Sequence, residues 1–222
     1  MSFIQPALAR QEHTLRFYAA PADYAHPSWW PAAFGALAGS TASPTPQAAA
    51  HLSRWMIGEY QLGAPHSAAE LAFDQPATRF WLLPPELVRR VAVDIGAALR
   101  RNLIRHCISR ASREQLNACF GADTLDFALS EAAAALAPPP RSPRAAERVP
   151  GFAECALVGG CMLLRSFDAA PSAQAQSRRA RLLFPRAWRM RSSSSTLPAP
   201  ALLPTAVDRA LQLQPSWRWL FC

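Results

Sequence analysis

PELVRRVAVDIGAALRRNLIRHC, residues 85–107, decides the fold of this chain. It opens the longest proline-free stretch, Glu86 to Ala137, in a sequence whose 222 residues include 21 prolines. Proline lacks a backbone N–H and clashes with the preceding helical turn, so its absence permits uninterrupted helices, and Pro85 suits a first helical position. Apolar residues recur at every fourth position of the opening helix: Leu87, Val91, Ile95, Leu99 and Leu103. We therefore expect residues 85–137 to form the helical heart of the fold.

Three consecutive helices are expected within this stretch. In the first, Arg90 and Asp94 take the polar side and are spaced to pair at i,i+4. The tetrapeptide SREQ at 112–115 has the form of a capping box and predicts a second helix, which Gly121 closes in a left-handed conformation. Asp123 is placed to cap the third helix. Its expected apolar face consists of Leu125, Leu129, Ala132, Ala133 and Leu136.

The remainder of the second half predicts further helices joined by exposed segments. Residues 138–150 (PPPRSPRAAERVP) indicate a Pro/Arg linker. Residues 151–167 are apolar on nearly every side and predict a buried helix, in which Gly159-Gly160 favours close helix–helix contact. RLLF at 181–184 suggests a short edge strand, and a last helix is expected over about 205–213. The fold class is thus mainly α: one compact helical domain over 1–222 with Pro-rich linkers and a minor strand pair.

The first 85 residues and the tail give weaker signals. Leu15–Tyr18 is interpreted as an extended piece, Trp29-Trp30-Pro31 as an anchored turn, and residues 47–60 as a helix. That helix is expected to turn Leu52, Trp55 and Met56 inward. Residues 217–222 (WRWLFC) are too apolar to remain in water, so we expect the tail to dock.

The charge is strongly basic and unevenly distributed. Formal net charge is +8, and arginine supplies all 23 basic residues, which is typical of a GC-rich genome. Two clusters stand out, Arg89 to Arg113 with seven arginines and one acid, and Arg178 to Arg191 with six arginines and none. A basic stripe attracts nucleic acid, anionic lipid or acidic proteins, but a solvated helix face is the more frequent explanation. No aromatic platform, zinc-finger spacing or RNA-recognition signature accompanies the arginines.

Catalytic and metal-binding motifs are absent from the sequence. It contains no glycine-rich phosphate loop, nucleophile elbow or H-E-x-x-H motif, and no C-x-x-C pair. Five cysteines, an odd number, do not predict a disulfide framework, and no apolar run approaches the length of a bilayer span. Buried thiols are expected at Cys107, Cys119, Cys155 and Cys161. We expect no enzyme activity, catalytic residue, cofactor or metal, and a soluble protein.

The order of segments resembles the K-subunit family of the bacterial type III secretion sorting platform (SctK, YscK and PscK). An early Leu15-Arg16-Phe17 is followed by Tyr24-Ala25-His26, and the central helix carries Ile95-Gly96-Ala97-Ala98-Leu99 with a trailing Ile104-Arg105-His106-Cys107-Ile108. A small-residue helix with glycine at 156–164 and a basic-apolar run at 179–185 follow. The Pro/Arg linker and the serine run at 192–195 are departures from the family pattern. The likeness covers residues from about 14 to 222.

The resemblance implies a cytoplasmic adaptor without catalysis, peripheral to the inner-membrane secretion apparatus. Its implied partners are the cytoplasmic domain of the inner-membrane ring protein (SctD-like) and the pod subunit (SctQ-like), and indirectly the stator and the export ATPase. Nucleic acid and direct membrane insertion are not expected. We hypothesise that Arg100, Arg101 and Arg105, on the exposed side of the central helix, contact an acidic partner surface; a solvated helix face is the alternative. A basic nucleic-acid-binding or regulatory protein that uses Arg178–Arg191 is the competing function.

Overall fold

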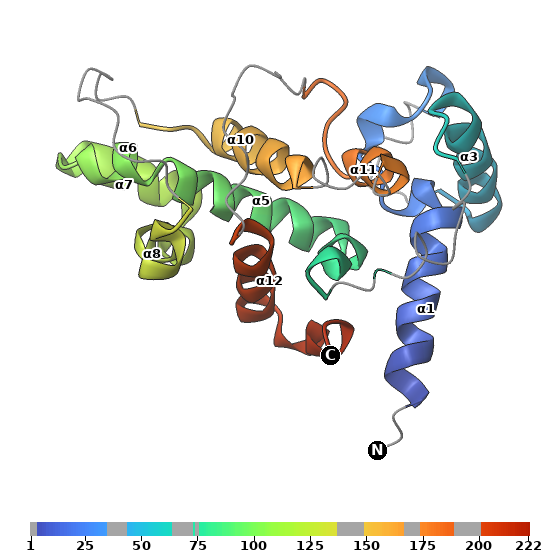
Figure 1. Cartoon of the computed structure of the whole chain (residues 1–222). Helices are drawn as coiled ribbons and strands as arrows, with labels where there is room; N and C mark the ends of the chain where they lie inside the picture. The colour runs from blue at the N-terminus through green and yellow to red at the C-terminus, as the bar shows by residue number, and fades with distance from the viewer. Residues whose placement is uncertain are drawn as a thin grey trace. The chain divides into compact units, whose positions relative to one another are not determined.

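The computed structural model describes residues 4–34, 44–63, 73, 76–136, 149–166, 174–188 and 201–222. All regular structure in these residues is helical, which confirms the mainly α class (Figure 1). Contacts divide the chain into two compact units. Unit 1 comprises Met1–Pro85, Phe167–Ser192 and Pro215–Cys222, and unit 2 comprises Glu86–Ser166 and Ser193–Gln214. The single domain over 1–222 stays a prediction.

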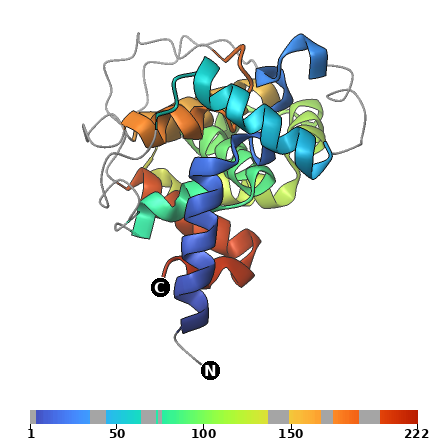
Figure 2. The ribbon, with the colours of Figure 1, turned by 90° about the vertical axis from the view of Figure 1, so that its right-hand side faces the viewer.

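Unit 1 is built from helices of both ends of the chain. Its α-helices are α1 (Ile4–Ala19), α3 (Pro46–Glu59) and α11 (Gln174–Arg181), and its 3-10 helices are η1 (Pro21–Asp23), η2 (Pro27–Trp29), η3 (Ala32–Phe34), η4 (Pro76–Leu82) and η6 (Pro215–Leu220). The expected docking of the tail is confirmed, since η6 contacts α1 (Figure 2) and Leu220 is fully buried. Arg79 holds this tail by donating to the carbonyls of Leu220 (3.2 Å) and Cys222 (3.1 Å).

Aromatic rings form much of the core of unit 1. Phe17 stacks on Tyr24 with ring centroids 5.2 Å apart, and the Tyr24 hydroxyl donates to the Phe17 carbonyl at 2.9 Å. The anchored turn expected at Trp29 is confirmed, because its indole N–H donates to the Phe184 carbonyl at 2.6 Å. Tyr24 and Trp29 thus bury their rings while the polar atom of each donates a hydrogen bond.

Several expectations for unit 1 are corrected. Leu15–Tyr18 is not extended; it lies within α1, where Phe17 and Tyr18 face the core. The helix expected over 47–60 is confirmed as α3, but of the three residues expected inward only Leu52 and Met56 are buried, and Trp55 is 38% exposed.

The short strand expected at 181–184 is wrong. Arg181 ends α11, and the residues after it continue as turns with i→i+3 hydrogen bonds, from Leu182 N to Arg179 O (3.0 Å) and from Leu183 N to Ala180 O (3.1 Å). The described residues contain no strand. A helical end outcompetes the edge strand because there is no second strand in the described part of the unit with which it could pair.

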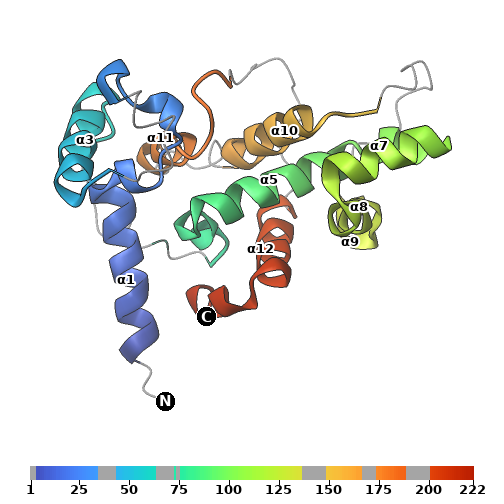
Figure 3. The same ribbon diagram turned by 180° about the vertical axis from the view of Figure 1, so that it is seen from behind.

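Unit 2 contains a central helix with shorter helices packed around it (Figures 1 and 3). Its helices are α5 (Pro85–Leu99), α6 (Arg101–His106), α7 (Arg110–Phe120), α8 (Ala122–Leu129), α9 (Glu131–Ala134), α10 (Phe152–Arg165) and α12 (Leu202–Leu213). The buried helix expected over 151–167 appears as α10, with Leu163 fully buried. The last helix begins at Leu202, earlier than expected.

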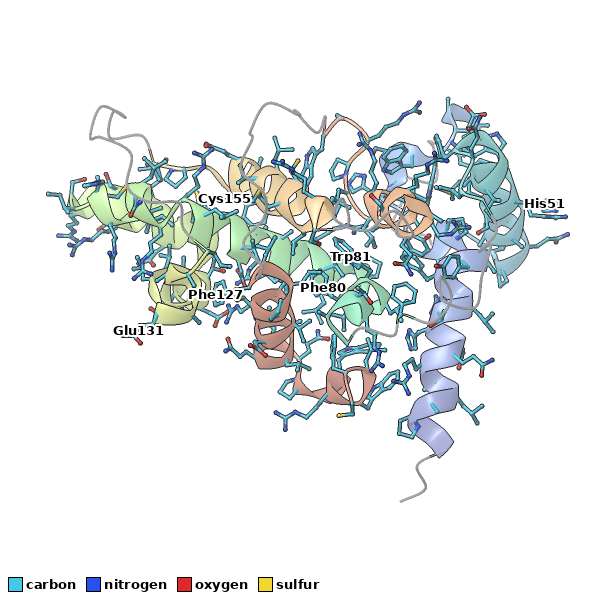
Figure 4. The ribbon with its side chains drawn as sticks, viewed as in Figure 1. His51, Phe80, Trp81, Phe127, Glu131 and Cys155 are labelled. Carbon is cyan, nitrogen blue, oxygen red and sulfur yellow. The ribbon has the colours of Figure 1, made fainter. Side chains whose placement is uncertain are left out.

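Two glycines let α5 and α10 cross with their backbones in contact. A Cβ atom added to Gly96 would lie 1.8 Å from the Cys155 carbonyl oxygen, and one added to Gly159 would lie 1.8 Å from the Ala92 carbonyl oxygen. No side chain other than hydrogen fits at either place. The close helix contact expected from Gly159-Gly160 is therefore confirmed. Figure 4 labels Cys155 on α10, close to α5.

The stretch 85–137 divides into more helices than the three expected. Helix α7 begins at Arg110 with Ser109 as its cap, because the Ser109 hydroxyl accepts from Ser112 N at 3.1 Å; the capping box at 112–115 is wrong. Gly121 has the expected positive φ of 75°. Asp123 does not cap α8, whose N-cap position is Gly121.

Ser130 ends α8 and caps α9, so the expected continuous third helix is interrupted. The break rotates the buried face, which consists of Thr124, Phe127, Ala128, Ala133 and Leu136. Of the five residues expected on that face only Ala133 and Leu136 are buried, and Leu129 is 40% exposed. Most of the linker at 138–150 and the whole serine run at 192–195 lie outside the described residues.

Candidate partner-binding surface

Arg105 is exposed, whereas the other two members of the hypothesised arginine trio are partly or fully buried. It lies in the last turn of α6, close to the break between α6 and α7. The break itself includes Ile108, which is 73% exposed. An exposed cationic side chain, Arg105, and an exposed apolar one, Ile108, thus lie within four residues of sequence.

Arg100 is partly exposed and already has an internal partner. Its Nη2 atom lies 3.0 Å from Glu154 Oε1, with 37% of the arginine side chain and 29% of the glutamate side chain exposed. This ion pair joins the end of α5 to the first turn of α10. Because both groups remain hydrated, the pair stabilises unit 2 only weakly, by up to about 1 kcal/mol.

Arg101 does not lie on the exposed side, and this part of the hypothesis is wrong. Its residue is 7% exposed, and its guanidinium donates to the carbonyls of Ser130 and Leu129, both at 2.9 Å. These carbonyls belong to the end of α8, where helical carbonyls lack intrahelical partners and the helix dipole is negative. Arg101 therefore holds the C-terminal end of α8 against α6.

A groove lies between α6, α7 and α8, and Arg105 is one of its lining residues. Figure 3 labels α7 and α8. It is open, encloses about 480 Å³, and mixes apolar with polar lining. Its lining residues are Ile104, Arg105, Cys107, Arg113, Leu116, Asn117, Ala122, Leu125, Asp126 and Leu129. The α8 contributions follow the spacing i, i+3, i+4 and i+7, which covers one helix face over about two turns.

The arginines of this groove form no ion pair with the described residues. Neither Arg105 nor Arg113 lies within 4.0 Å of a carboxylate in the part of the chain that the structure describes. By contrast Arg110, on the same helix as Arg113, has its Nε 2.8 Å from Glu114 Oε1. Asp126 is the one acid of the lining, so the groove carries a net positive charge.

A buried ion cluster fixes α8 and α12 on α5. The sequence predicts Asp94 on the polar side of α5, but the structure buries it fully. Its carboxylate accepts from Arg209 Nε at 2.7 Å and from Thr124 Oγ1 at 2.8 Å. The expected i,i+4 pair with Arg90 is present, with Nε to Oδ1 at 3.6 Å. Arg209 also donates to Asp123.

Electrostatics favour the charged form of Arg209. Burial acts to lower the pKa of Arg209, but its hydrogen bonds to Asp123 and Asp94 outweigh burial and raise that pKa. The Arg209 guanidinium also lies over the Phe127 ring, 4.8 Å from its centroid, and Figure 4 labels Phe127 on α8. The cluster fixes α8, one wall of the groove; its Asp94 and Arg209 side chains are buried, whereas the Asp123 side chain is 61% exposed.

The second basic cluster serves structure in unit 1. Arg179 is 1% exposed and donates to the carbonyls of Leu62, Gly63 (2.6 Å) and Tyr18 (3.3 Å). Burial lowers its pKa. Arg178 donates to the Gln61 carbonyl at 3.0 Å. The arginines of 189–191 lie outside the described residues.

No group of three His, Cys, Asp or Glu side chains among the described residues is arranged to hold a metal ion. Cys107 and Cys155 are buried as expected, whereas Cys119 is exposed and Cys161 half-buried. Burial raises the pKa of Cys155 to about 12. Among the described helices, none has the length and hydropathy of a membrane span.

Sequence reasoning missed the groove and the buried ion cluster. A signal for the cluster exists, because Asp94 is the only charge in VAVDIGAAL, residues 91–99, and a lone acid in an apolar helix requires a buried partner. Nothing in the sequence names Arg209 as that partner. The groove arises from the helix break at 107–109, which no glycine or proline announces.

Fold and surface place the chain in the class of all-helical proteins with an open, basic surface groove. A family model described as YOP proteins translocation protein K (YscK) matches residues 11–213, and the chain belongs to this family. Members of this family are components of the type III secretion apparatus. The match confirms the family expected from the order of the motifs. No curated protein and no solved structure matches the chain.

Proposed function

We propose that this protein is a non-enzymatic adaptor of the type III secretion sorting platform. It links the cytoplasmic domain of the inner-membrane ring protein to the pod subunit, and through the pods it connects to the stator and the export ATPase. It acts in the cytoplasm, peripheral to the membrane-embedded ring. The observation that carries the proposal is the family match over residues 11–213.

The surface of unit 2 supports this function. An adaptor needs a rigid body that presents distinct surfaces, and the α5–α10 crossing with the Asp94–Arg209 cluster supplies rigidity. Exposed arginine is suited to protein contacts because its planar guanidinium binds a carboxylate in two places. We assign the partner contact to Arg105 and, more weakly, to Arg100, while Arg101 positions α8 behind them.

A bridging experiment tests the adaptor function. The purified cytoplasmic domain of the ring protein is immobilised, and the pod subunit is added with and without the full-length chain. We expect retention of the pod subunit only when the chain is present, at a defined stoichiometry. Binding of neither neighbour, or direct binding of the two neighbours without the chain, would refute the adaptor.

Nucleic-acid binding is the competing function, and a salt series separates the two. A protein held by phosphate contacts loses affinity for random duplex DNA steeply between about 50 and 200 mM salt. The burial of Arg179 removes one cation from the Arg178–Arg191 cluster on which nucleic-acid binding would depend. We expect weak DNA binding at every salt concentration.

A further inference from the structure

We propose that the groove between α6, α7 and α8 binds an acidic amphipathic helix of a partner protein. The inference rests on the proposed adaptor function and specifies what one of its surfaces recognises. Three features of the groove carry it: apolar side chains left in water, lining residues at helical spacing, and arginines without a carboxylate within 4.0 Å among the residues that the structure describes.

The apolar component comes from α8 and the α6–α7 break. Leu129 is 40% exposed and lines the groove, and Leu125 beside it is partly exposed. Ile108, next in sequence to the lining residue Cys107, is 73% exposed. Ile104 and Leu116 form the buried part of the lining. Exposed apolar residues gathered beside one depression mark a binding surface more strongly than the same residues scattered singly.

The shape of the groove fits a helix. Stripes from two neighbouring helices border it, one at i, i+3 and i+4 on α7 (Arg113, Leu116, Asn117) and one at i, i+3, i+4 and i+7 on α8 (Ala122, Leu125, Asp126, Leu129). Side-chain ridges of a third helix pack between such rows. The α8 stripe is about 10 Å long, which matches the apolar residues i to i+7 of a bound helix.

Charge identifies the occupant as acidic. Arg105 and Arg113 line the groove without a carboxylate within 4.0 Å in the described chain, so a partner's Asp or Glu side chains can bind them without breaking an internal pair. The chain's own segment at 137–148 is an unsuitable occupant, because its sequence carries three arginines and one acid and would be repelled. A partner helix with leucine-like residues on one face and carboxylates at its edges satisfies both components.

Designed peptides test the groove without requiring the native partner. The probe is a fluorescein-labelled helical peptide of about 14 residues with leucines at i, i+3 and i+7 and glutamates beside them; the comparison peptide replaces each glutamate with arginine. We expect saturable binding of the acidic peptide to the full-length chain, at least about tenfold tighter than binding of the basic one. No saturable binding, or no preference for the acidic peptide, would overturn the proposal.

Matched variants locate the binding. Arg105→Glu with Arg113→Glu should weaken acidic-peptide binding at least about tenfold, and Leu129→Ser about threefold or more. Arg110→Glu is the control, since Arg110 is exposed on the same helix but does not line the groove. All variants should keep the thermal midpoint of the parent. An equal loss in the control, or displacement of the peptide by duplex DNA at equal charge, would indicate general anion binding and reject the groove.

The same variants in the bridging experiment separate this inference from the adaptor function. If the parent chain bridges its two neighbours and the double arginine variant bridges equally well, the groove assignment is wrong while the adaptor stands. If the parent does not bridge but the acidic peptide binds the groove selectively, the adaptor assignment is wrong and the groove stands. A photo-cross-linking residue at position 129 that reacts only within its own chain would also reject the partner helix.

Discussion

Units 1 and 2 bury an arginine by different means. In unit 2 the Arg209 side chain is 5% exposed and pairs with the carboxylates of Asp94 and Asp123. In unit 1, Arg179 is surrounded by neutral carbonyl oxygens and the face of the Tyr18 ring, whose centroid is 4.8 Å from the guanidinium carbon. In the first arrangement the carboxylate of Asp94 is buried with the cation, whereas in the second the two Nη atoms of Arg179 donate to carbonyls and its buried Nε has no acceptor among the described residues.

The comparison shows that arginines clustered in the sequence do not necessarily form an exposed basic surface. Arg101, Arg179 and Arg209 are each buried and donate several hydrogen bonds inside the fold. Lysine cannot replace this role, since its single ammonium lacks the planar fork that reaches several carbonyls at once. Since arginine supplies all 23 Lys/Arg-type cations of this chain, only its exposed, unpaired arginines are candidates for contact with a partner.

Removal of one buried charge from each unit should give the largest losses in stability and the clearest difference between the units. Asp94→Ala leaves Arg209 buried with one carboxylate fewer, and we expect the free energy of unfolding of unit 2 to fall by about 3–5 kcal/mol. Arg179→Met leaves neutral carbonyls without a donor and should cost only about 1–3 kcal/mol. Denaturant unfolding followed by circular dichroism measures both.

Asp208→Ala is the control for the first variant, because Asp208 is an exposed acid next to Arg209 in sequence. Its effect should stay within about 0.5 kcal/mol. If Asp94→Ala were as mild as this control, the ion cluster would not stabilise unit 2.

Glycine packing gives the second largest expected effect. The two glycines of the α5–α10 crossing are replaced one at a time, as Gly96→Ala and Gly159→Ala. Each added Cβ would lie 1.8 Å from a backbone carbonyl oxygen, so the helices must separate, and we expect a loss of about 3 kcal/mol. In unit 1, Gly58 lies in α3 with no atom within 4 Å of an added Cβ, and Gly58→Ala should stabilise by about 0.5–1 kcal/mol. A loss of stability at Gly58, or no loss at Gly96 and Gly159, would contradict the assigned difference in packing.

The sequence predicted those parts of the fold that depend on local patterns. Proline placement and four-residue periodicity located α5, and the nearly continuous apolar character of residues 151–167 located α10. The glycine pair of 159–160 predicted a close helix contact without identifying Gly96 as the other side of the crossing. The helix boundaries at Ser109 and Ser130 were missed because serine caps are common in sequence and only some of them begin a helix.

The candidate site was less predictable, for a physical reason. Whether an arginine is exposed depends on which carbonyls or acids lie near it after folding, and those of Arg101 come from residues 28 and 29 positions further along the chain. Periodicity places Arg100, Arg101 and Arg105 on a helix but does not show that α8 ends against it. Family resemblance supplied the function class without supplying any of these contacts.

Arg101 and Arg105 sharpen the comparison within unit 2. Arg101→Met removes the donors of two carbonyls at the end of α8 and should lower stability by about 1–2 kcal/mol. Arg105→Met changes an exposed side chain and should lie within about 0.5 kcal/mol of the parent, while weakening binding of the acidic peptide. Equal stability effects would contradict the assignment of one arginine to structure and the other to the surface.

The smallest expected effect belongs to His13 in unit 1. Its ring lies 5.3 Å from that of Trp217 and 5.6 Å from that of Trp219, centroid to centroid. Burial lowers the pKa of His13 below the ordinary value of 6.5, with Arg16 adding to the effect and Glu12 opposing it. Unfolding therefore takes up a proton between the folded pKa and 6.5, because only the unfolded chain is protonated in that window.

It follows that the histidine contributes no penalty above pH 6.5 and an increasing one as the pH falls through that value. His13→Gln should flatten the fall in stability between neutral and mildly acidic pH, measured as the shift of the urea midpoint relative to the parent at each pH. Trp217→Ala, which exposes the ring, should flatten it likewise, although it lowers stability at every pH. If His13→Gln leaves the pH slope unchanged, the docked tail does not shield His13, and the aromatic contacts of unit 1 are looser at its C-terminal end than at Phe17 and Tyr24.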